Sequence, residues 1–381
     1  MFRAWAAIAA AILLLTGCGS GDGLTHSDIP PLTGQAATFD QAVVDQSNHR
    51  LYISDSTLLG VDIFDVSKSE PRYLSTLKLG VPVHGLAVAP DLHKIFVGED
   101  GGGIGVIEGD PTSKKVDTLL STIKTPAKKA VDLLGYDPVD HLLFAGSPDD
   151  GFLSQVDAIR NLYLKNLPLG SGLEQPRYNP GDGLLYLTNM TKDLVYAIDP
   201  QKLTVVKQWP VGMTCSPMGM DINPATGEAM FGCSSPKIAY TLLWSLREGK
   251  VIGTFNQVAD ADQVVFDPSQ ARFLAAGASN GKTAIAVFGG HPVKYQALML
   301  THADSRAVAY DGANRVVYTP DRKRGQEGLI SFAMPKPEAQ LPSFITPLAY
   351  LLVLVALGAI VWLYGRRRER ARRLAGRPTY S

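Results

Sequence analysis

The chain has 381 residues, with 36 Lys and Arg against 36 Asp and Glu, so its formal net charge is zero and charged residues make up only 19% of it. This balance excludes a strongly basic nucleic-acid-binding protein and a strongly acidic disordered protein. Hydrophobic residues make up 45% of the chain, which is enough for a large buried core. The 37 Gly and 25 Pro favour many turns and short strands over long helices.

The first residues have the organisation of an export signal. One Arg and an apolar run that is too short to span a bilayer predict a signal peptide over residues 1–17. The motif Leu15-Thr16-Gly17-Cys18 resembles the lipobox of bacterial lipoproteins and predicts cleavage before a lipid-modified Cys18. An uncleaved anchor helix, or an ordinary signal in which Cys18 is incidental, is the alternative. Each of these places the rest of the chain outside the cytoplasm.

One pattern recurs between residues 38 and 335: a turn with Pro, Asp, Asn or Gly is followed by a strand rich in aromatic and β-branched residues. Seven copies occur, at residues 45–55, 89–99, 137–147, 179–189, 223–233, 267–277 and 311–321. Four strands at a period near 44 residues predict an all-β fold, a seven-bladed β-propeller of four-stranded blades. Six or eight blades remain open if one copy is wrongly assigned.

The last repeat supplies only three strands. We expect residues 18–37 to form a linker and the missing fourth strand, which would close the ring and leave no unpaired edge.

Two segments of the repeats carry a family resemblance. Leu185-Tyr186-Leu187-Thr188-Asn189 nearly reproduces a Tyr-Val-Thr-Asn signature, and Leu51-Tyr52-Ile53-Ser54-Asp55 is a looser copy. The repeats therefore resemble the YVTN family of bacterial β-propellers over about residues 38–335, with a poorer match in blades 3, 5 and 6. Propellers of related shape also serve in periplasmic quinone-linked or haem-linked dehydrogenases and in lactonases, so the resemblance leaves these enzymes open as alternative functions.

The C-terminal part of the sequence predicts a membrane anchor. After a linker at residues 336–343, residues 344–364 contain no charge, and 21 residues of helix cover about 31 Å, the thickness of a bilayer core. Residues 365–381 carry seven Arg and one Glu, which marks a cytoplasmic tail. A cell-wall sorting signal is a weaker alternative, because residues 341–346 match Leu-Pro-x-Thr-Gly poorly. We therefore expect a transmembrane helix in the cytoplasmic membrane of a bacterium.

The residues that open the innermost strands form a candidate ligand site. Aligned across the repeats, they are Asp40, His84, Asp132, Glu174, Met218, Asp262 and Arg306. A sevenfold arrangement would bring them together around one mouth of the central channel. Several carboxylates and an imidazole there could hold a divalent cation or a cationic ligand. The alternative is a solvated polar rim that binds nothing.

Three further features have simple structural interpretations. Cys215 and Cys233 are predicted to form a disulfide, because the chain is expected in an oxidising compartment; a metal site and free thiols are the alternatives. His49, His93 and His141 precede the second strand in three repeats and are interpreted as turn residues rather than metal ligands. The Gly-rich run at residues 100–105 lies between two predicted strands and is interpreted as a hairpin turn rather than a phosphate loop.

No sequence signature of an enzyme occurs, including Cys-x-x-Cys-His, Gly-x-x-x-x-Gly-Lys-Ser, Gly-x-Ser-x-Gly and His-Glu-x-x-His. The sequence therefore favours binding or scaffolding in the bacterial cell envelope, with no cofactor predicted apart from the candidate cation. Without Arg3 and residues 365–381, the chain has 28 basic and 35 acidic residues. A protein or peptide partner of the propeller is therefore expected to be cationic, and nucleic acid is not expected.

Overall fold

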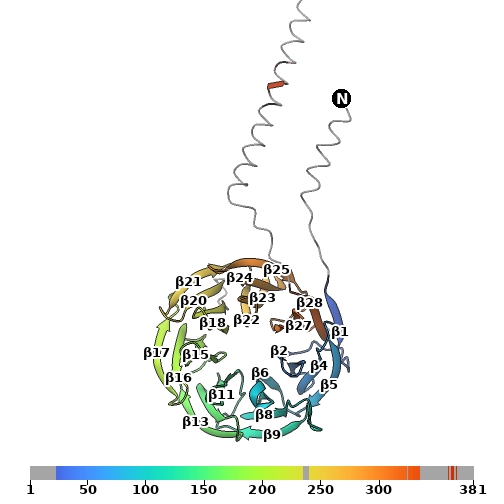
Figure 1. Ribbon diagram of the computed structural model, residues 1–381, viewed down its shortest axis with the longest axis vertical. Coiled ribbons are helices and arrows are strands. Elements are labelled where there is room, and N and C mark those ends of the chain that lie inside the picture. Colours follow the sequence, from blue (N-terminus) through green and yellow to red (C-terminus); the bar gives the residue numbers. More distant parts are fainter. Residues whose placement is uncertain are drawn as a thin grey trace, which may run out of the picture. The chain divides into compact units, whose positions relative to one another are not determined.

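Seven four-stranded antiparallel sheets form a ring in the computed structural model (Figure 1). The structure describes residues 23–234, 240–323 and 325–334, together with 359, 362, 363 and 366. The chain divides into two compact units, Met1–Lys336 and Pro337–Ser381, and the ring belongs to the first. The predicted seven-bladed β-propeller of four-stranded blades is confirmed.

The blades follow the chain in order, and in blades 1 to 6 the strands run from the innermost to the outermost. The strands of blades 1 and 2 are β2 (Phe39–Asp45), β3 (Arg50–Asp55), β4 (Gly60–Asp65), β5 (Arg72–Lys78), β6 (Val83–Ala89), β7 (Lys94–Glu99), β8 (Gly103–Glu108) and β9 (Leu119–Lys124). Those of blades 3 and 4 are β10 (Leu134–Asp137), β11 (Leu142–Ser147), β12 (Phe152–Asp157), β13 (Leu162–Pro168), β14 (Arg177–Asn179), β15 (Leu184–Asn189), β16 (Leu194–Asp199) and β17 (Thr204–Pro210).

The remaining strands complete the ring. Blades 5 and 6 consist of β18 (Pro217–Asn223), β19 (Glu228–Cys233), β20 (Thr241–Ser245), β21 (Lys250–Phe255), β22 (Ala259–Asp267), β23 (Arg272–Ser279), β24 (Lys282–Gly289) and β25 (Lys294–Leu300). Blade 7 contains β26 (Ala309–Asp311), β27 (Val316–Asp321), β28 (Gly328–Ala333) and β1 (Thr25–Asp28). A short 3-10 helix, η1 (Pro90–Leu92), joins β6 to β7.

In six of the seven blades, the turn that begins the repeat is held by the side chain that ends the innermost strand. Asp45 Oδ1 accepts hydrogen bonds from the backbone N–H groups of Ser47 and Asn48, at 3.0 and 3.2 Å. The same position accepts backbone N–H groups in five other blades, through Asp137, Asn179, Asn223, Asp267 and Asp311. This Asx turn is the physical reason why Asp and Asn recur there.

The three recurring histidines are turn residues. His49, His93 and His141 have φ values of 52°, 50° and 52°, in the left-handed region. Gly183 and Gly227 take the equivalent position in blades 4 and 5, also with positive φ. Because these histidines belong to three different blades and serve the same local turn, their recurrence reflects backbone geometry. The Gly-rich run likewise forms the hairpin between β7 and β8.

The hydrophobic core lies between neighbouring blades. The second and third strands of a blade are buried on both faces, as in β3 and β4, whereas the outermost strands, such as β17, are largely exposed. One cluster joins Leu51 and Phe64 of blade 1 to Tyr318 of blade 7. Each blade therefore covers its faces with its neighbours, as repeat architectures require.

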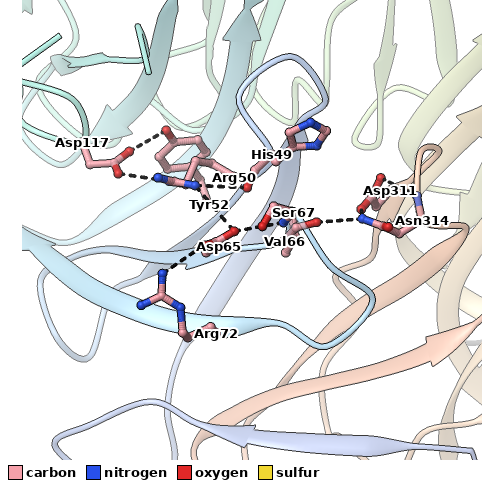
Figure 2. A network of polar contacts seen from close by, with 10 residues as sticks. All are labelled: His49, Arg50, Tyr52, Asp65, Val66, Ser67, Arg72, Asp117, Asp311 and Asn314. Carbon is pink, nitrogen blue, oxygen red and sulfur yellow. Dashed lines mark hydrogen bonds and ion pairs between the residues drawn. The ribbon is translucent and has the colours of Figure 1, made fainter. Parts of the chain in front are cut away.

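Polar contacts also tie blade 1 to both of its neighbours (Figure 2). On one side, Asp117 of blade 2 accepts hydrogen bonds from the hydroxyl of Tyr52 at 2.8 Å and from Nε of Arg50 at 3.3 Å. On the other side, Asn314 of blade 7 donates to the carbonyl of Val66 at 2.8 Å. The sheets of adjacent blades share no ladder hydrogen bonds, so these side-chain contacts join blade 1 to its neighbours in addition to the apolar core.

The ring is closed by the N-terminal strand. β1 pairs antiparallel with β28, with Thr25 opposite Ser331 and Asp28 opposite Gly328. Nε2 of His26 lies 3.3 Å from the carboxylate of Asp321 in β27. The fourth strand of blade 7 therefore comes from residues 18–37, as the sequence predicted.

Cys215 and Cys233 are joined by a disulfide, with their Cα atoms 4.7 Å apart. Cys215 precedes β18 and Cys233 ends β19, so the bond links the two ends of a hairpin. The predicted signal peptide and Cys18 lie outside the described residues. So do all but four residues of the predicted span and tail, and these four are helical. Among the described residues, no helix is long and apolar enough to cross a membrane.

Neighbouring blades approach most closely at one end of the channel, where glycines permit contact between backbones. A Cβ on Gly98 would lie 2.2 Å from the carbonyl oxygen of Val131, and a Cβ on Gly219 would lie 1.9 Å from that of Asp262. Real Cβ atoms do not come so close to an oxygen, so any side chain there would force two blades apart.

We predict that Gly98→Ala lowers the free energy of unfolding by about 1–3 kcal/mol, the usual cost of overpacking a buried site. Gly146→Ala is the matched control, because Gly146 has the same place in β11 and its added Cβ would meet its nearest atom at 3.5 Å. Chemical denaturation of both variants measures the difference. Equal stability of the two variants would contradict the close approach.

Candidate functional site

Four of the seven predicted rim residues lie on irregularities of the innermost strands. The ladder registers shift between Phe39 and Ala42, Val83 and Leu86, Pro217 and Met220, and Ala259 and Gln263. Asp40, His84, Met218 and Asp262 fall within these bulged segments. A bulge turns a side chain away from the regular alternation, which aims these residues at the mouth of the channel.

The other three rim residues, Asp132, Glu174 and Arg306, immediately precede the regular parts of their innermost strands. Backbone hydrogen bonds hold two of them in place: Asp132 donates to the carbonyl of Gly146 at 2.8 Å, and Glu174 donates to that of Thr188 at 3.0 Å. We call the seven residues the mouth ring. Met218 is buried and contributes no charge to it.

His84 is held between two carboxylates. Nδ1 lies 3.4 Å from Asp40 Oδ2, and Nε2 lies 2.9 Å from Asp100 Oδ1. Burial by itself would lower the pKa of His84, but the hydrogen bonds to Asp40 and Asp100 and the charge of Asp132 outweigh it and raise the pKa to about 9. The imidazole is therefore a cation at neutral pH.

Arg306 forms the second cationic part of the ring. Nη1 contacts the carboxylate of Asp260, and Nη2 lies 3.4 Å from Asp262 Oδ2. Burial raises the pKa of Asp262 to about 6, although the charge of Arg306 acts in the opposite direction. Arg306 and His84 thus each pair with two carboxylates, so neither is available to neutralise a further carboxyl group.

Glu174 is a carboxyl group of the mouth ring that pairs with neither His84 nor Arg306. It is only 8% exposed, and its side chain makes no hydrogen bond or ion pair with any described residue. Burial and the charge of Asp262 raise the pKa of Glu174 well above its usual value. Burial and the charge of Asp40 likewise raise the pKa of Asp132 to about 8. The mouth ring therefore has more acidic groups than its own cations neutralise.

A metal ion would have to compete with these pairs. The ligand atoms of Asp40, His84 and Asp132 lie within 4.8 Å of one another, which is close enough for one ion. A metal binds only a neutral imidazole. Because both ring nitrogens of His84 face carboxylates, His84 must lose a proton before it could serve as a ligand. The carboxylates are the more suitable ligands here, and they favour a hard cation.

Comparison with known proteins yields a fold and no family. No family model matches the chain, and no curated protein matches its sequence. Among solved structures, 1496 chains match it. One, from the crystal structure of a mitotic checkpoint complex, has a TM-score of 0.64 at 14% identity, covering 81% of this chain and 93% of its own. Another, from Kuenenia stuttgartiensis hydrazine synthase, has a TM-score of 0.54 at 13% identity, covering 65% and 76%.

These identities establish the propeller fold alone. So many matches at such low identity are typical of a fold that serves unrelated functions, and function must therefore be argued from the residues of this chain.

Sequence reasoning predicted the seven positions of the mouth ring but missed two acids that contact it, Asp100 and Asp260. Asp100 lies in the hairpin that the Gly-rich run predicts, and Asp260 lies two residues before an aligned rim position. Neither follows the repeat, so only their ion pairs with His84 and Arg306 identify them.

A repeated dipeptide next to the mouth ring was also missed, although the sequence shows it. An acid is followed by Gln at Asp40-Gln41, Glu174-Gln175 and Asp262-Gln263. These glutamines are buried and bridge the innermost strands. Gln41 Oε1 accepts the N–H of Leu86 at 2.9 Å, and Gln263 Nε2 donates to the carbonyl of Ala42 at 2.9 Å. We call them the amide belt, and they tie the innermost strands together just inside the mouth.

The raised pKa values predict that the propeller loses stability as the pH rises. A carboxyl whose pKa is higher in the folded than in the unfolded state stabilises the fold fully below its unfolded pKa and loses this effect as the pH passes its folded pKa. For Asp132 this window runs from 3.8 to about 8. His84 acts in the same direction, from 6.5 to about 9.

We therefore expect Glu174→Gln, which removes one such group, to be more stable than the wild type at about pH 8 and to gain little at about pH 4. Denaturation at several pH values measures this. Glu70→Gln, at an exposed carboxylate, is the control. A variant whose stability follows the same pH curve as the wild type would contradict the raised pKa of Glu174.

Proposed function

We propose that the protein is a membrane-anchored binding module of the bacterial cell envelope, a propeller of the YVTN type whose mouth ring binds a cationic group of a protein or peptide partner. The predicted signal peptide, lipidation at Cys18 and transmembrane helix at residues 344–364 are parts of this proposal. The observation that carries it is Glu174, a buried carboxyl group without a partner among the described residues, within a ring of further acids.

A cation fits this site better than an anion or a neutral group. His84 and Arg306 are already paired with carboxylates, so no cation of the ring remains for Glu174. An ammonium or guanidinium group could donate to Glu174 and Asp132 and take the place of a bound proton. The excess of acidic residues in the predicted extracytoplasmic part would attract such a partner over a longer range.

The position of the site supports a role in binding. The register of β1 and β28 places Gly23 and Met334 at the end of the propeller opposite the mouth ring. The mouth ring therefore lies at the end of the propeller away from both Gly23 and Met334, which leaves it open to a partner. The similar folds include a chain of a mitotic checkpoint complex and one of a hydrazine synthase, so the fold agrees with either an assembly or an enzyme.

A synthetic peptide containing two Lys residues, and the same peptide with both acetylated, test this proposal on the full-length protein in lipid nanodiscs. Acetylation removes the charge of the Lys side chain, and a hydrogen bond to a charged group is worth about 1.5–3 kcal/mol. We therefore expect the unmodified peptide to bind about 10-fold or more tightly. Glu174→Gln should remove most of this preference and Glu70→Gln none. Equal binding of both peptides, or an unchanged preference in Glu174→Gln, would refute the proposal.

A divalent cation is the second candidate ligand, favoured by the close grouping of Asp40, His84 and Asp132. Ligands that bind only the folded state raise the unfolding temperature. We expect Ca²⁺ or Mn²⁺ to raise it in the wild type and in Asp149→Asn, which alters an exposed acid, but not in Asp132→Asn. No change with Ca²⁺, Mn²⁺ or Zn²⁺ would exclude this candidate.

A further inference from the structure

The end of the channel opposite the mouth ring contains a chamber of about 540 Å³. All seven innermost strands contribute to its wall, and none of the mouth-ring residues does. Its volume is within the range of small-molecule sites, about 300–1000 Å³. The amide belt lies between the chamber and the mouth, so the two ends of the channel are separate sites.

The wall of the chamber has the opposite chemistry to the mouth ring, although the same strands build both. Four residues after each member of the mouth ring, every strand carries an apolar or aromatic residue. They are Val44, Val88, Tyr136, Tyr178, Ile222, Phe266 and Tyr310. All except Ile222 line the chamber. At a rise of about 3.3 Å per residue, the two rings lie about 13 Å apart along the strands.

One cation, Arg177, stands in the chamber wall, which also includes the carboxyl groups of Asp221 and Asp267. Its Nε donates to the carbonyl of Met220 at 2.9 Å and lies 3.3 Å from Asp221 Oδ1. Asp221 itself accepts the backbone N–H groups of Phe266, at 2.7 Å, and Ile222, at 2.9 Å. Both residues are thereby fixed in position.

The terminal nitrogens of Arg177 remain available to a ligand. They make no hydrogen bond with the described residues, and the side chain is 22% exposed. A fixed planar guanidinium with free Nη1 and Nη2 binds a carboxylate through two parallel hydrogen bonds.

We propose that the chamber binds an amphiphilic carboxylate, with its apolar body against the ring of Val, Tyr and Phe side chains and its carboxylate on the guanidinium of Arg177. The apolar wall alone would accept many molecules. The single oriented guanidinium selects those with an anionic end, as polar groups in apolar pockets do. This ligand is independent of the cationic group proposed for the mouth ring.

The source of such a ligand follows from where the chain enters and leaves the propeller. Thr25, at the start of β1, lies opposite Ser331 of β28. Ala333, at the end of β28, lies opposite Val316. Val316 follows the turn at residues 312–313, and this turn lines the chamber. The described chain therefore enters and leaves the propeller at the chamber end. Given the anchors of the proposed function, on which this step rests, the expected ligand is a fatty acid. Without them, a soluble carboxylate of the same chemistry is the ligand.

Three probes with the same apolar chain test the proposal on the full-length protein in nanodiscs: octanoate, octan-1-ol and octylammonium. Binding is followed by saturation-transfer NMR and calorimetry. We expect octanoate to bind about 10-fold or more tightly than octan-1-ol, and octylammonium to bind most weakly. Palmitic acid in the disc should compete with octanoate, whereas methyl palmitate should not. Competition by soluble 3-phenylpropionate alone would identify a soluble source.

Variants assign the binding to the chamber. Arg177→Gln should abolish the preference for octanoate, and Arg160→Gln, at an exposed arginine, should keep it. Val88→Trp places a larger side chain in the chamber wall, two blades away from Arg177, and should abolish binding, which keeps the test decisive if Arg177→Gln does not fold. Glu174→Gln should leave octanoate binding unchanged, so failure at the mouth ring is seen separately. Equal binding of octanoate and octan-1-ol, no binding at millimolar octanoate, or unaffected binding in Val88→Trp would overturn the proposal.

Discussion

Closure of the ring by β1 is the interaction on which the rest of the structure depends. Four residues, Thr25–Asp28, supply the last strand of blade 7 although they precede blade 1 in the chain. Because of this pairing, the first and last blades meet as ordinary neighbours, and Asn314 reaches Val66 while Arg322 donates to the carbonyl of Ala37. The edge that an open ring would expose is thereby covered.

The mouth ring is a consequence of closure. Asp40 belongs to blade 1, and Asp262 and Arg306 belong to blades 6 and 7, so these residues come together only in a closed ring. Bringing these residues together buries carboxyl groups, and burial raises the pKa values of Asp132, Glu174 and Asp262. Ionisable groups that are costly to bury are characteristic of functional sites, because selection for stability alone would favour other residues at these positions.

The same seven innermost strands build a different candidate site at each end of the channel. Each innermost strand has a mostly charged position at the mouth and an apolar or aromatic residue four positions later, and the amide belt lies between the two. At the mouth, acids outnumber the cations that could neutralise them. At the chamber, Arg177 stands in a mainly apolar wall beside Asp221 and keeps its terminal nitrogens free of hydrogen bonds with the described residues. The two sites therefore suit ligands of opposite charge, and no single ligand satisfies both.

The sequence by itself determined the repeat and the turn chemistry, and it favoured seven blades. Asp45 and its counterparts hold turns within a few residues of themselves, and His49 occupies a left-handed position in the same turn. Such contacts are local, so they leave a pattern that recurs at each period. The mouth ring was predictable for the same reason, since equivalent positions in a closed ring face one axis.

Only the tertiary structure decided how these residues are paired. Asp100 and Asp260 lie outside the repeat, yet they hold His84 and Arg306. The bulges in β6 and β18 contain Gly85 and Gly219, which meet the backbone of a neighbouring blade at Asp132 and Asp262. Arg177 is fixed by Met220 and Asp221 of the next blade. All of these contacts join residues of different blades or hairpin ends, and their geometry follows from the packing of complete blades rather than from any local preference of the chain.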